Sequence, residues 1–122
     1  MPRTVFVVDD SNVVIASLKK TFEMVNFKVE TAKDGLEALE RVRSGFKPDL
    51  ILTDVHMPNM DGLEFIKNVR PILRFTPILV LTTESQTAKR EQAKKLGATG
   101  WLVKPISGPD LLKVVKQILP GS

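Results

Sequence analysis

The sequence predicts an α/β fold in which a doubly wound, five-stranded parallel sheet carries five helices. Apolar runs alternate along the chain with segments of helical period, which is the pattern of successive βαβ units. The run Ile78–Leu81 has no polar–apolar alternation, as expected for a strand that helices cover on both faces. Phe27–Glu30 does alternate, so we expect that strand at an edge. The predicted strands are Thr4–Asp9, Phe27–Thr31, Leu50–Asp54, Ile78–Thr82 and Trp101–Lys104.

Residues that can cap or open a helix mark the helix starts. The first helix begins at Ser11 or Asn12, the second near Asp34, the third at Asp61 and the fifth around Pro109. Apolar side chains at helical spacing then predict the buried faces. These side chains are Val14, Leu18, Phe22 and Val25 in the first helix, Leu36, Leu39 and Val42 in the second, Leu63, Ile66 and Val69 in the third, and Leu111, Val115 and Ile118 in the fifth.

The fourth predicted helix, Gln86–Leu96, has a thin apolar stripe of Ala88, Ala93 and Leu96 among many Lys and Arg residues. Because it would bury little apolar surface, we expect low local stability, a property common among elements that move. Pro120 and Gly121 are expected to end the fifth helix.

The composition is that of an ordinary globular protein, with 122 residues, 43% of them hydrophobic and 26% charged. We therefore expect one domain over residues 1–122. No apolar run is long enough to cross a bilayer, and the strand pattern begins too near Met1 to leave room for a signal peptide. The absence of Cys excludes disulfides and thiolate metal sites. We expect a cytoplasmic monomer without membrane contact.

The net charge of +4 and the pI near 9.5 would suit a protein that binds nucleic acid. The basic residues, however, are spread over predicted helix faces. No run of like charge forms an arm, and no helix-turn-helix or zinc pattern is present. We therefore expect no nucleic-acid partner.

Three carboxylates follow predicted strands: Asp9 and Asp10 after one apolar run, and Asp54 after another. In open α/β sheets, the carboxyl ends of the strands are where ligands gather. Two carboxylates about 4 Å apart repel by about 4 kcal/mol at an effective dielectric near 20. A cluster of carboxylates therefore either has one carboxyl group with a raised pKa or recruits a divalent ion. A site made of oxygen ligands alone suits Mg²⁺. Alone, Asp9 and Asp10 would indicate a strand end and a helix cap; with Asp54, a metal site is favoured.

Two further strands end in complementary groups, the hydroxyl of Thr82 and the ammonium of Lys104. Each has a simpler interpretation by itself, since Thr82 could merely finish a strand and Lys104 could be solvated before a turn. The combination of acid pair, acid, hydroxyl and lysine, each at the end of its own strand, favours one shared site.

At these residues the chain resembles the receiver domain of two-component response regulators, most closely the single-domain chemotaxis regulators of the CheY type. The resemblance extends from Val5 to Leu119. The segments Thr82–Ser85 and Gly97–Trp101 resemble the chemotaxis branch. The family implies the strand order 2-1-3-4-5. The resemblance depends on Asp9, Asp10, Asp54, Met57–Gly62, Thr82, Lys104 and Pro105.

The resemblance implies a role for each of these residues. Asp54 would accept a phosphoryl group from a phosphohistidine on a sensor histidine kinase of the CheA type. Phosphoryl transfer needs mainly in-line positioning and charge neutralisation. Lys104 would contact a phosphoryl oxygen, Thr82 would donate its hydroxyl, and the Lys104–Pro105 bond would be cis. The ligands of Mg²⁺ would be Asp9, Asp10, Asp54 and the backbone carbonyl of His56.

The resemblance also implies a switch, in which Thr82 moves toward the phosphoryl group and the aromatic residue Trp101 turns inward. The family more often has Tyr at that position, and Trp101 could simply pack under the fourth helix. The side chains of His56 and Glu84 would tune how water reaches the acyl phosphate. Ligation of a metal by the His56 side chain is the less favoured alternative.

The phosphorylated form would act by binding a protein such as a component of the flagellar motor switch, and a dedicated phosphatase is a further candidate partner. A phosphorelay shuttle or a phosphate sink is the alternative. The expected docking face is basic, which favours an acidic partner segment. Its charged residues are Lys89, Arg90, Lys94, Lys95, Lys113 and Lys116.

Two other classes fit the sequence less well. An Asp-nucleophile phosphatase of the haloacid-dehalogenase kind usually has a second Asp two residues after the nucleophile, where this chain has His56, and the chain has no capping insertion. A flavodoxin-like cofactor binder needs a phosphate-cradling first loop, from which Asp9 and Asp10 would repel a phosphate. We therefore expect a signalling protein rather than an enzyme with an external substrate.

Overall fold

The computed structural model describes residues 2–119, in which five strands alternate with five helices. The strands form one parallel sheet in the order β2-β1-β3-β4-β5, so the predicted fold class and strand order are confirmed. The strands are β1 (Thr4–Val8), β2 (Lys28–Ala32), β3 (Leu50–Thr53), β4 (Ile78–Thr82) and β5 (Gly100–Val103). The helices are α1 (Asn12–Glu23), α2 (Gly35–Arg43), α3 (Gly62–Val69), α4 (Thr87–Leu96) and α5 (Gly108–Ile118).

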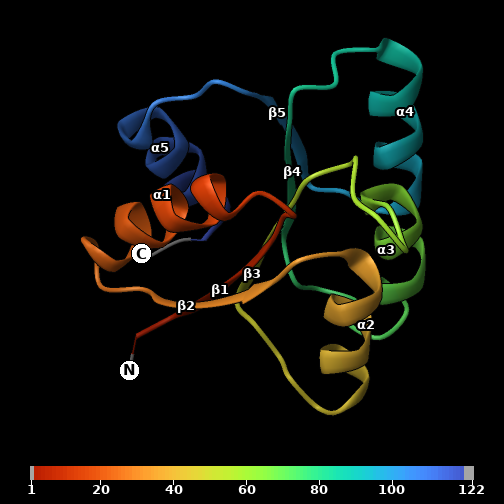
Figure 1. The fold of residues 1–122 in the computed structure, drawn as a ribbon, viewed down its shortest axis with the longest axis horizontal. Helices are drawn as coiled ribbons and strands as arrows, with labels where there is room; N and C mark the ends of the chain where they lie inside the picture. Colours follow the sequence, from red (N-terminus) through yellow and green to blue (C-terminus); the bar gives the residue numbers. More distant parts are fainter. Residues whose placement is uncertain (1, 120–122) are drawn as a thin grey trace.

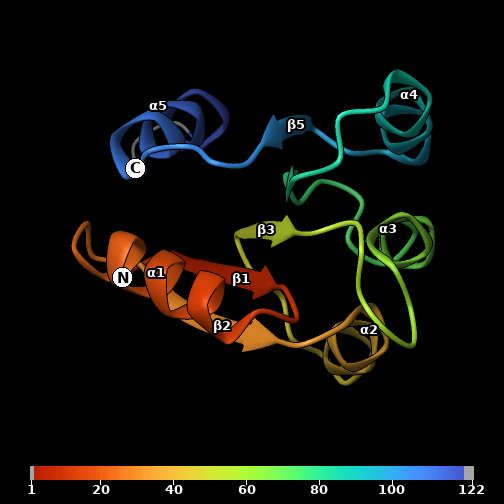
Figure 2. The same ribbon diagram turned by 45° about the horizontal axis from the view of Figure 1, so that its top comes forward.

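The helices cover both faces of the sheet. Helices α1 and α5 lie on one face, and α2, α3 and α4 lie on the other (Figures 1 and 2). Alternate residues of each central strand therefore enter different cores: in β1, Val5 and Val7 face α1 and α5, whereas Phe6 and Val8 face the other three helices. Because both faces are covered, the central strands have the continuous apolar sequences that predicted them.

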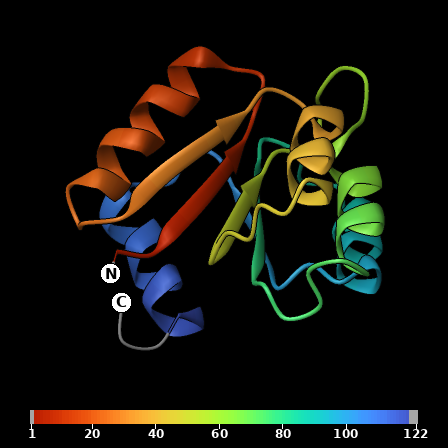
Figure 3. The same cartoon turned by 90° about the horizontal axis from the view of Figure 1, so that it is seen from below.

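Strand β2 lies at an edge of the sheet beside β1, which separates it from β3 (Figure 3). Only Ala32 of this strand is buried, whereas every residue of β3 and β4 is buried. The alternating sequence therefore predicted the edge position correctly. All five predicted strands agree with the observed bounds to within one residue at each end.

Side chains cap four helices. Ser11, Asp34, Asp61 and Ser107 each accept a hydrogen bond from the backbone N–H three residues later. The first three lie where the sequence predicts a helix start, whereas the cap of α5 at Ser107 was not predicted. Helix α4 has no side-chain cap, and it ends at Gly97, whose φ of 113° lies in the left-handed region that favours glycine. Pro120 and Gly121, which we expected to end α5, lie outside the described residues.

Three predicted core positions are wrong. Val25 follows the end of α1 and is 45% exposed, because the chain turns through Asn26, whose φ is positive. Leu36 is 41% exposed because the buried face of α2 consists of Gly35, Ala38, Leu39 and Val42. Leu36 is one residue further along the helix than Gly35, so its side chain is rotated by about 100° about the helix axis relative to Gly35. Ala88 is exposed because Ala93 is the buried contact of α4.

Within residues 2–119, no helix combines the length and the apolar character that a membrane crossing requires.

Candidate functional site

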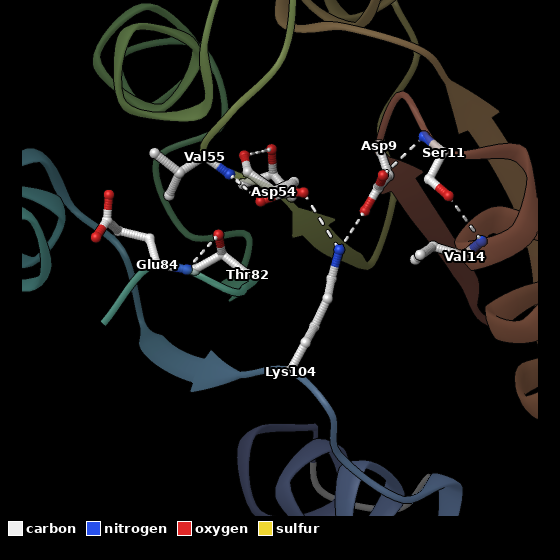
Figure 4. Close-up of polar contacts among 9 residues, drawn as sticks. Asp9, Ser11, Val14, Asp54, Val55, Thr82, Glu84 and Lys104 are labelled. Atoms are coloured by element: carbon white, nitrogen blue, oxygen red, sulfur yellow. Dashed lines mark hydrogen bonds and ion pairs between the residues drawn. The ribbon is translucent and has the colours of Figure 1, made fainter. Parts of the chain in front are cut away.

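The three carboxylates predicted to converge lie together at the carboxyl ends of β1 and β3. Asp9, Asp10 and Asp54 each offer an oxygen within 4.8 Å of the others' oxygens. Asp9 is buried, Asp54 is half-buried and Asp10 is exposed, so the cluster runs from the core to the surface. Figure 4 shows Asp9 and Asp54 approaching from neighbouring strands.

Backbone hydrogen bonds fix the positions of the two inner carboxylates. The N–H of Asp9 donates to Ala32 O (3.0 Å), and the N–H of Asp54 donates to Val8 O (3.0 Å), so each residue continues the ladder of its strand by one position. Oδ1 of Asp9 also accepts from the N–H of Ser11 (2.9 Å). The sheet therefore holds both acids before any ligand arrives.

Lys104 reaches the cluster from the end of β5. Its Nζ lies 2.9 Å from Oδ2 of Asp9 and 3.2 Å from Oδ2 of Asp54 (Figure 4). Burial lowers the pKa of Lys104, but the hydrogen bond to Asp9 and the charge of Asp54 outweigh this effect, so its pKa lies above the ordinary value. One ammonium offsets one of three negative charges. The remaining negative charge and the all-oxygen donor set fit Mg²⁺.

Comparison with known proteins identifies the family. Residues 5–116 match the family described as "Response regulator receiver domain". The chain belongs to this family. The receiver domain is also 36% identical over 119 residues to "Response regulator MprA" of Mycobacterium sp. (strain KMS), and 36% identical over 122 residues to "Alkaline phosphatase synthesis transcriptional regulatory protein PhoP" of Bacillus subtilis (strain 168).

These matches cover 98% and 100% of the receiver domain, but 51% of MprA and 50% of PhoP. The chain thus spans about half the length of the curated relatives it matches. Among solved structures, Vibrio cholerae chemotaxis protein CheY4 is 43% identical with a TM-score of 0.90, over 98% of this chain and 100% of that one. CheY of Borrelia burgdorferi, solved as a complex with CheX, BeF3 and Mg²⁺, is 25% identical with a TM-score of 0.91, over 97% of this chain and 90% of that one.

Thr82, the last residue of β4, is fully buried beside the receiver's carboxylate cluster. Its Oγ1 accepts a hydrogen bond from the N–H of Glu84 (3.2 Å; Figure 4), and a hydroxyl that accepts can still donate its own hydrogen. Trp101 pairs with Val80 across β4 and β5. Because paired residues share a face and faces alternate along a strand, Thr82 and Trp101 lie on the same face of the sheet.

The side chain of Trp101 is half-buried against the core beneath α4. It also lines a groove of about 450 Å³ between α4 and β5, together with Arg90, Lys94 and Ala98. Lys113 and Lys116 of the expected docking face are not part of this groove. They line a separate apolar groove between α5 and the end of α1.

The two residues predicted to tune the site contact each other. Nε2 of His56 lies 2.9 Å from Oε1 of Glu84, which links the loop after β3 to the loop after β4. The hydrogen bond with His56 and a second one from the N–H of Gln86 lower the pKa of Glu84. The ring of His56 therefore contacts Glu84, and the carboxylate cluster of the described residues consists of the three aspartates. The Lys104–Pro105 bond is cis.

Sequence reasoning missed a contact that supports the loop after Asp54. The side-chain amide of Asn59 donates to Oδ2 of Asp34 (2.7 Å), and the N–H of Gly35 donates to Met60 O (3.0 Å). The Pro58–Asn59 dipeptide is a turn signal that could have indicated the loop. No local pattern pairs Asn59 with a helix cap 25 residues earlier.

Proposed function

We propose that the chain is a phosphorylation-activated receiver whose phosphoacceptor is Asp54. The observation that carries this proposal is the position of Lys104, which is ion-paired with both Asp9 and Asp54. A lysine at this point neutralises part of the acid cluster and can reach an oxyanion placed beside Asp54. The phosphoryl donor is a phosphohistidine on a sensor histidine kinase of the CheA type.

In the transfer, an oxygen of the Asp54 carboxylate attacks the phosphorus atom while the bond from phosphorus to the histidine nitrogen breaks. The product is an acyl phosphate on Asp54, and the kinase regains a neutral imidazole after protonation of the leaving nitrogen. The ammonium of Lys104 leaves Asp54 for a phosphoryl oxygen and stabilises the transferring group as a point charge. The hydroxyl of Thr82 then donates to another phosphoryl oxygen.

Asp9, Asp10, Asp54 and the backbone carbonyl of His56 would hold Mg²⁺. When bound, this ion would neutralise charge on the phosphoryl oxygens. The Mg²⁺ in the complex of Borrelia burgdorferi CheY supports the assignment. So does the excess of carboxylates over ammonium groups in the cluster.

The shared sheet face of Thr82 and Trp101 supports a switch that joins them. Movement of Thr82 toward the phosphoryl group would open space on that face, and the Trp101 ring would turn into it. The ring lines the groove beside α4, so its movement would reshape that surface. The bridge between His56 and Glu84 would in turn tune the access of water to the acyl phosphate.

For the output, we propose that residues 1–122 form one receiver domain, which acts in the cytoplasm as a monomer and binds a protein target in chemotaxis. Support comes from Vibrio cholerae CheY4, which the match covers completely. The groove beside Trp101 is lined by two basic residues, Arg90 and Lys94, and by one acid, Glu91, and this excess of positive charge favours an acidic partner segment. A role in transcription is the second candidate, because PhoP is named a transcriptional regulatory protein. The name of PhoP speaks against our prediction that the protein has no nucleic-acid partner.

The decisive experiment is incubation of the purified chain with acetyl phosphate and Mg²⁺, followed by mass spectrometry to locate the modification. We expect one phosphoryl group on Asp54 and none on the Asp54→Asn variant. Equal labelling of both proteins would overturn the proposal. Recovery of a flagellar switch component by the phosphorylated form would support chemotaxis, whereas altered transcript levels in a deletion strain with normal motility would support the second candidate.

A further inference from the structure

The loop between β3 and α3, residues 54–61, contains two elements of the proposed site, the carboxylate of Asp54 and the carbonyl of His56. Its base is closed by the hydrogen bond from the N–H of Gly62 to Val55 O (2.8 Å). Gly62 is required there, because a Cβ at that position would overlap the carbonyl oxygen of Asp54. The base of the loop is therefore rigidly joined to the backbone of Asp54.

The tip of the loop is held from outside by the N-terminus of α2. The carboxylate of Asp34 accepts two hydrogen bonds in different directions. Oδ1 accepts from the N–H of Glu37 (2.8 Å) and caps its own helix, while Oδ2 accepts from the side-chain amide of Asn59 (2.7 Å). Both bonds lower the pKa of Asp34, the cap bond more strongly. A single carboxylate thus joins a helix start to the loop.

The backbone makes the same connection next to this carboxylate. The N–H of Gly35 donates to Met60 O (3.0 Å), and a Cβ at Gly35 would lie 2.7 Å from that oxygen. Asn59 itself has a φ of 65°, which is uncommon for a residue other than glycine. The tip of the loop therefore has one defined conformation, which Asp34 and the close approach of Gly35 support.

From these contacts we infer that Asp34 is a positioning residue for the phosphoacceptor site, acting through Asn59 on the loop that carries the His56 carbonyl. This inference depends on the proposed function. Asp34 is not one of the residues proposed to hold the phosphoryl group or Mg²⁺. Its contribution is to restrict the loop, so that the oxygen ligands are arranged before Mg²⁺ and the phosphoryl donor arrive.

Two variants remove the hydrogen bond between Asn59 and Asp34, one by changing the acceptor and the other by changing the donor. Asp34→Ser keeps a hydroxyl that can cap α2 but is too short to reach Asn59. Asn59→Gly removes the amide and keeps a residue that accepts positive φ. Ser44→Ala is the matched control, because it removes an exposed hydrogen bond from the other end of α2. Each variant and the Asp34→Ser/Asn59→Gly pair are compared with the parent chain.

Three quantities are measured: the Mg²⁺ dissociation constant by calorimetry, the rate of Asp54 labelling by acetyl phosphate, and amide hydrogen exchange in residues 56–61 without Mg²⁺. We expect Mg²⁺ binding to weaken by about threefold to tenfold in both single variants. This is less than the roughly tenfold to hundredfold loss seen when a group bonded directly to a metal ligand is removed. Loop exchange should accelerate, and Ser44→Ala should match the parent.

The double variant separates positioning from a general loss of stability. If Asp34 acts through Asn59, the double variant loses no more Mg²⁺ affinity than either single variant. Losses that add, or variants that bind Mg²⁺ and exchange as the parent does, would overturn the inference while the parent is still labelled at Asp54. A parent that is not labelled at Asp54 and does not bind Mg²⁺ would instead overturn the proposed function.

Discussion

Nζ of Lys104, which follows the last strand, lies 2.9 Å from Oδ2 of Asp9, which follows the first. Strands β3 and β4 separate β1 from β5 in the sheet. The lysine side chain therefore extends across the ends of two strands to reach the most buried acid of the cluster. The same ammonium contacts Asp54 between them. This arrangement makes the stability of the domain depend on the charges at its proposed site.

Replacement of Lys104 by Met keeps the length of the side chain and removes its charge. Without Mg²⁺, the free energy of unfolding should fall by about 1–3 kcal/mol, because the buried carboxylate of Asp9 loses its charged partner. Added Mg²⁺ should restore part of the loss by mass action. Urea titrations with and without Mg²⁺ measure both effects. Lys19→Met, at an exposed position of α1, is the control and should change stability by less than about 0.5 kcal/mol.

Asp10→Asn removes one of the three negative charges at the exposed side of the cluster. We expect the Mg²⁺-free variant to be more stable than the parent by about 1 kcal/mol, since repulsion among nearby carboxylates falls even after solvent screening. The same variant should bind Mg²⁺ at least about tenfold more weakly. Urea unfolding measures the predicted gain in stability, and calorimetry measures the predicted loss of Mg²⁺ affinity. A variant that is less stable and binds as tightly would contradict it, and Glu23→Gln serves as the remote control.

Trp101 is the only Trp in a chain without Tyr, so its fluorescence reports on one position. We expect its emission to change when Mg²⁺ and acetyl phosphate are added together, because the ring turns on the sheet face that it shares with Thr82. Asp54→Asn should show no response to acetyl phosphate. An unchanged spectrum from a sample shown by mass spectrometry to be phosphorylated would exclude the coupling.

Arg70 joins the end of α3 to the loop after α4. Its guanidinium donates to Leu73 O (2.8 Å), Thr76 O (2.7 Å) and Gly97 O (2.7 Å). Arg70→Met should lower the free energy of unfolding by about 2 kcal/mol or more, because three carbonyls lose a charged donor. The exposed neighbour provides the comparison: Arg74→Met should change stability by less than about 0.5 kcal/mol. Similar losses in the two variants, measured by urea unfolding, would refute a special role for Arg70.

Asp34→Ala should destabilise the domain by about 1 kcal/mol at pH 7 through loss of the α2 cap. The cap bond and the bond from Asn59 lower the folded-state pKa of Asp34. A lowered pKa adds stability above the unfolded-state pKa, which is about 3.9, and this stability is lost as pH falls through the folded value. The difference between parent and variant should therefore shrink below about pH 4. A difference that stays constant from pH 7 to pH 3 would show that the charge is not involved.

The positions of the strands and of the site residues could be predicted because they follow local patterns. Apolar runs such as Leu50–Leu52 are followed at once by the polar group that reaches the sheet edge, and parallel strands bring those edges together. The exposure of Leu36, by contrast, was predicted wrongly, because local patterns do not decide it. Two faces of a nine-residue helix carry apolar residues, and only its contacts with the sheet and α3 decide which face is buried.

By itself, the sequence determined the order of strands and helices and which chemical groups stand at the strand ends, since both depend on residues next to one another in the chain. The tertiary structure decided which of those groups touch. The pairing of Lys104 with Asp9, the bond between Asn59 and Asp34 and the bridge from His56 to Glu84 span 95, 25 and 28 residues. Contacts over such separations depend on how helices and loops pack against the sheet, a property that no local pattern encodes.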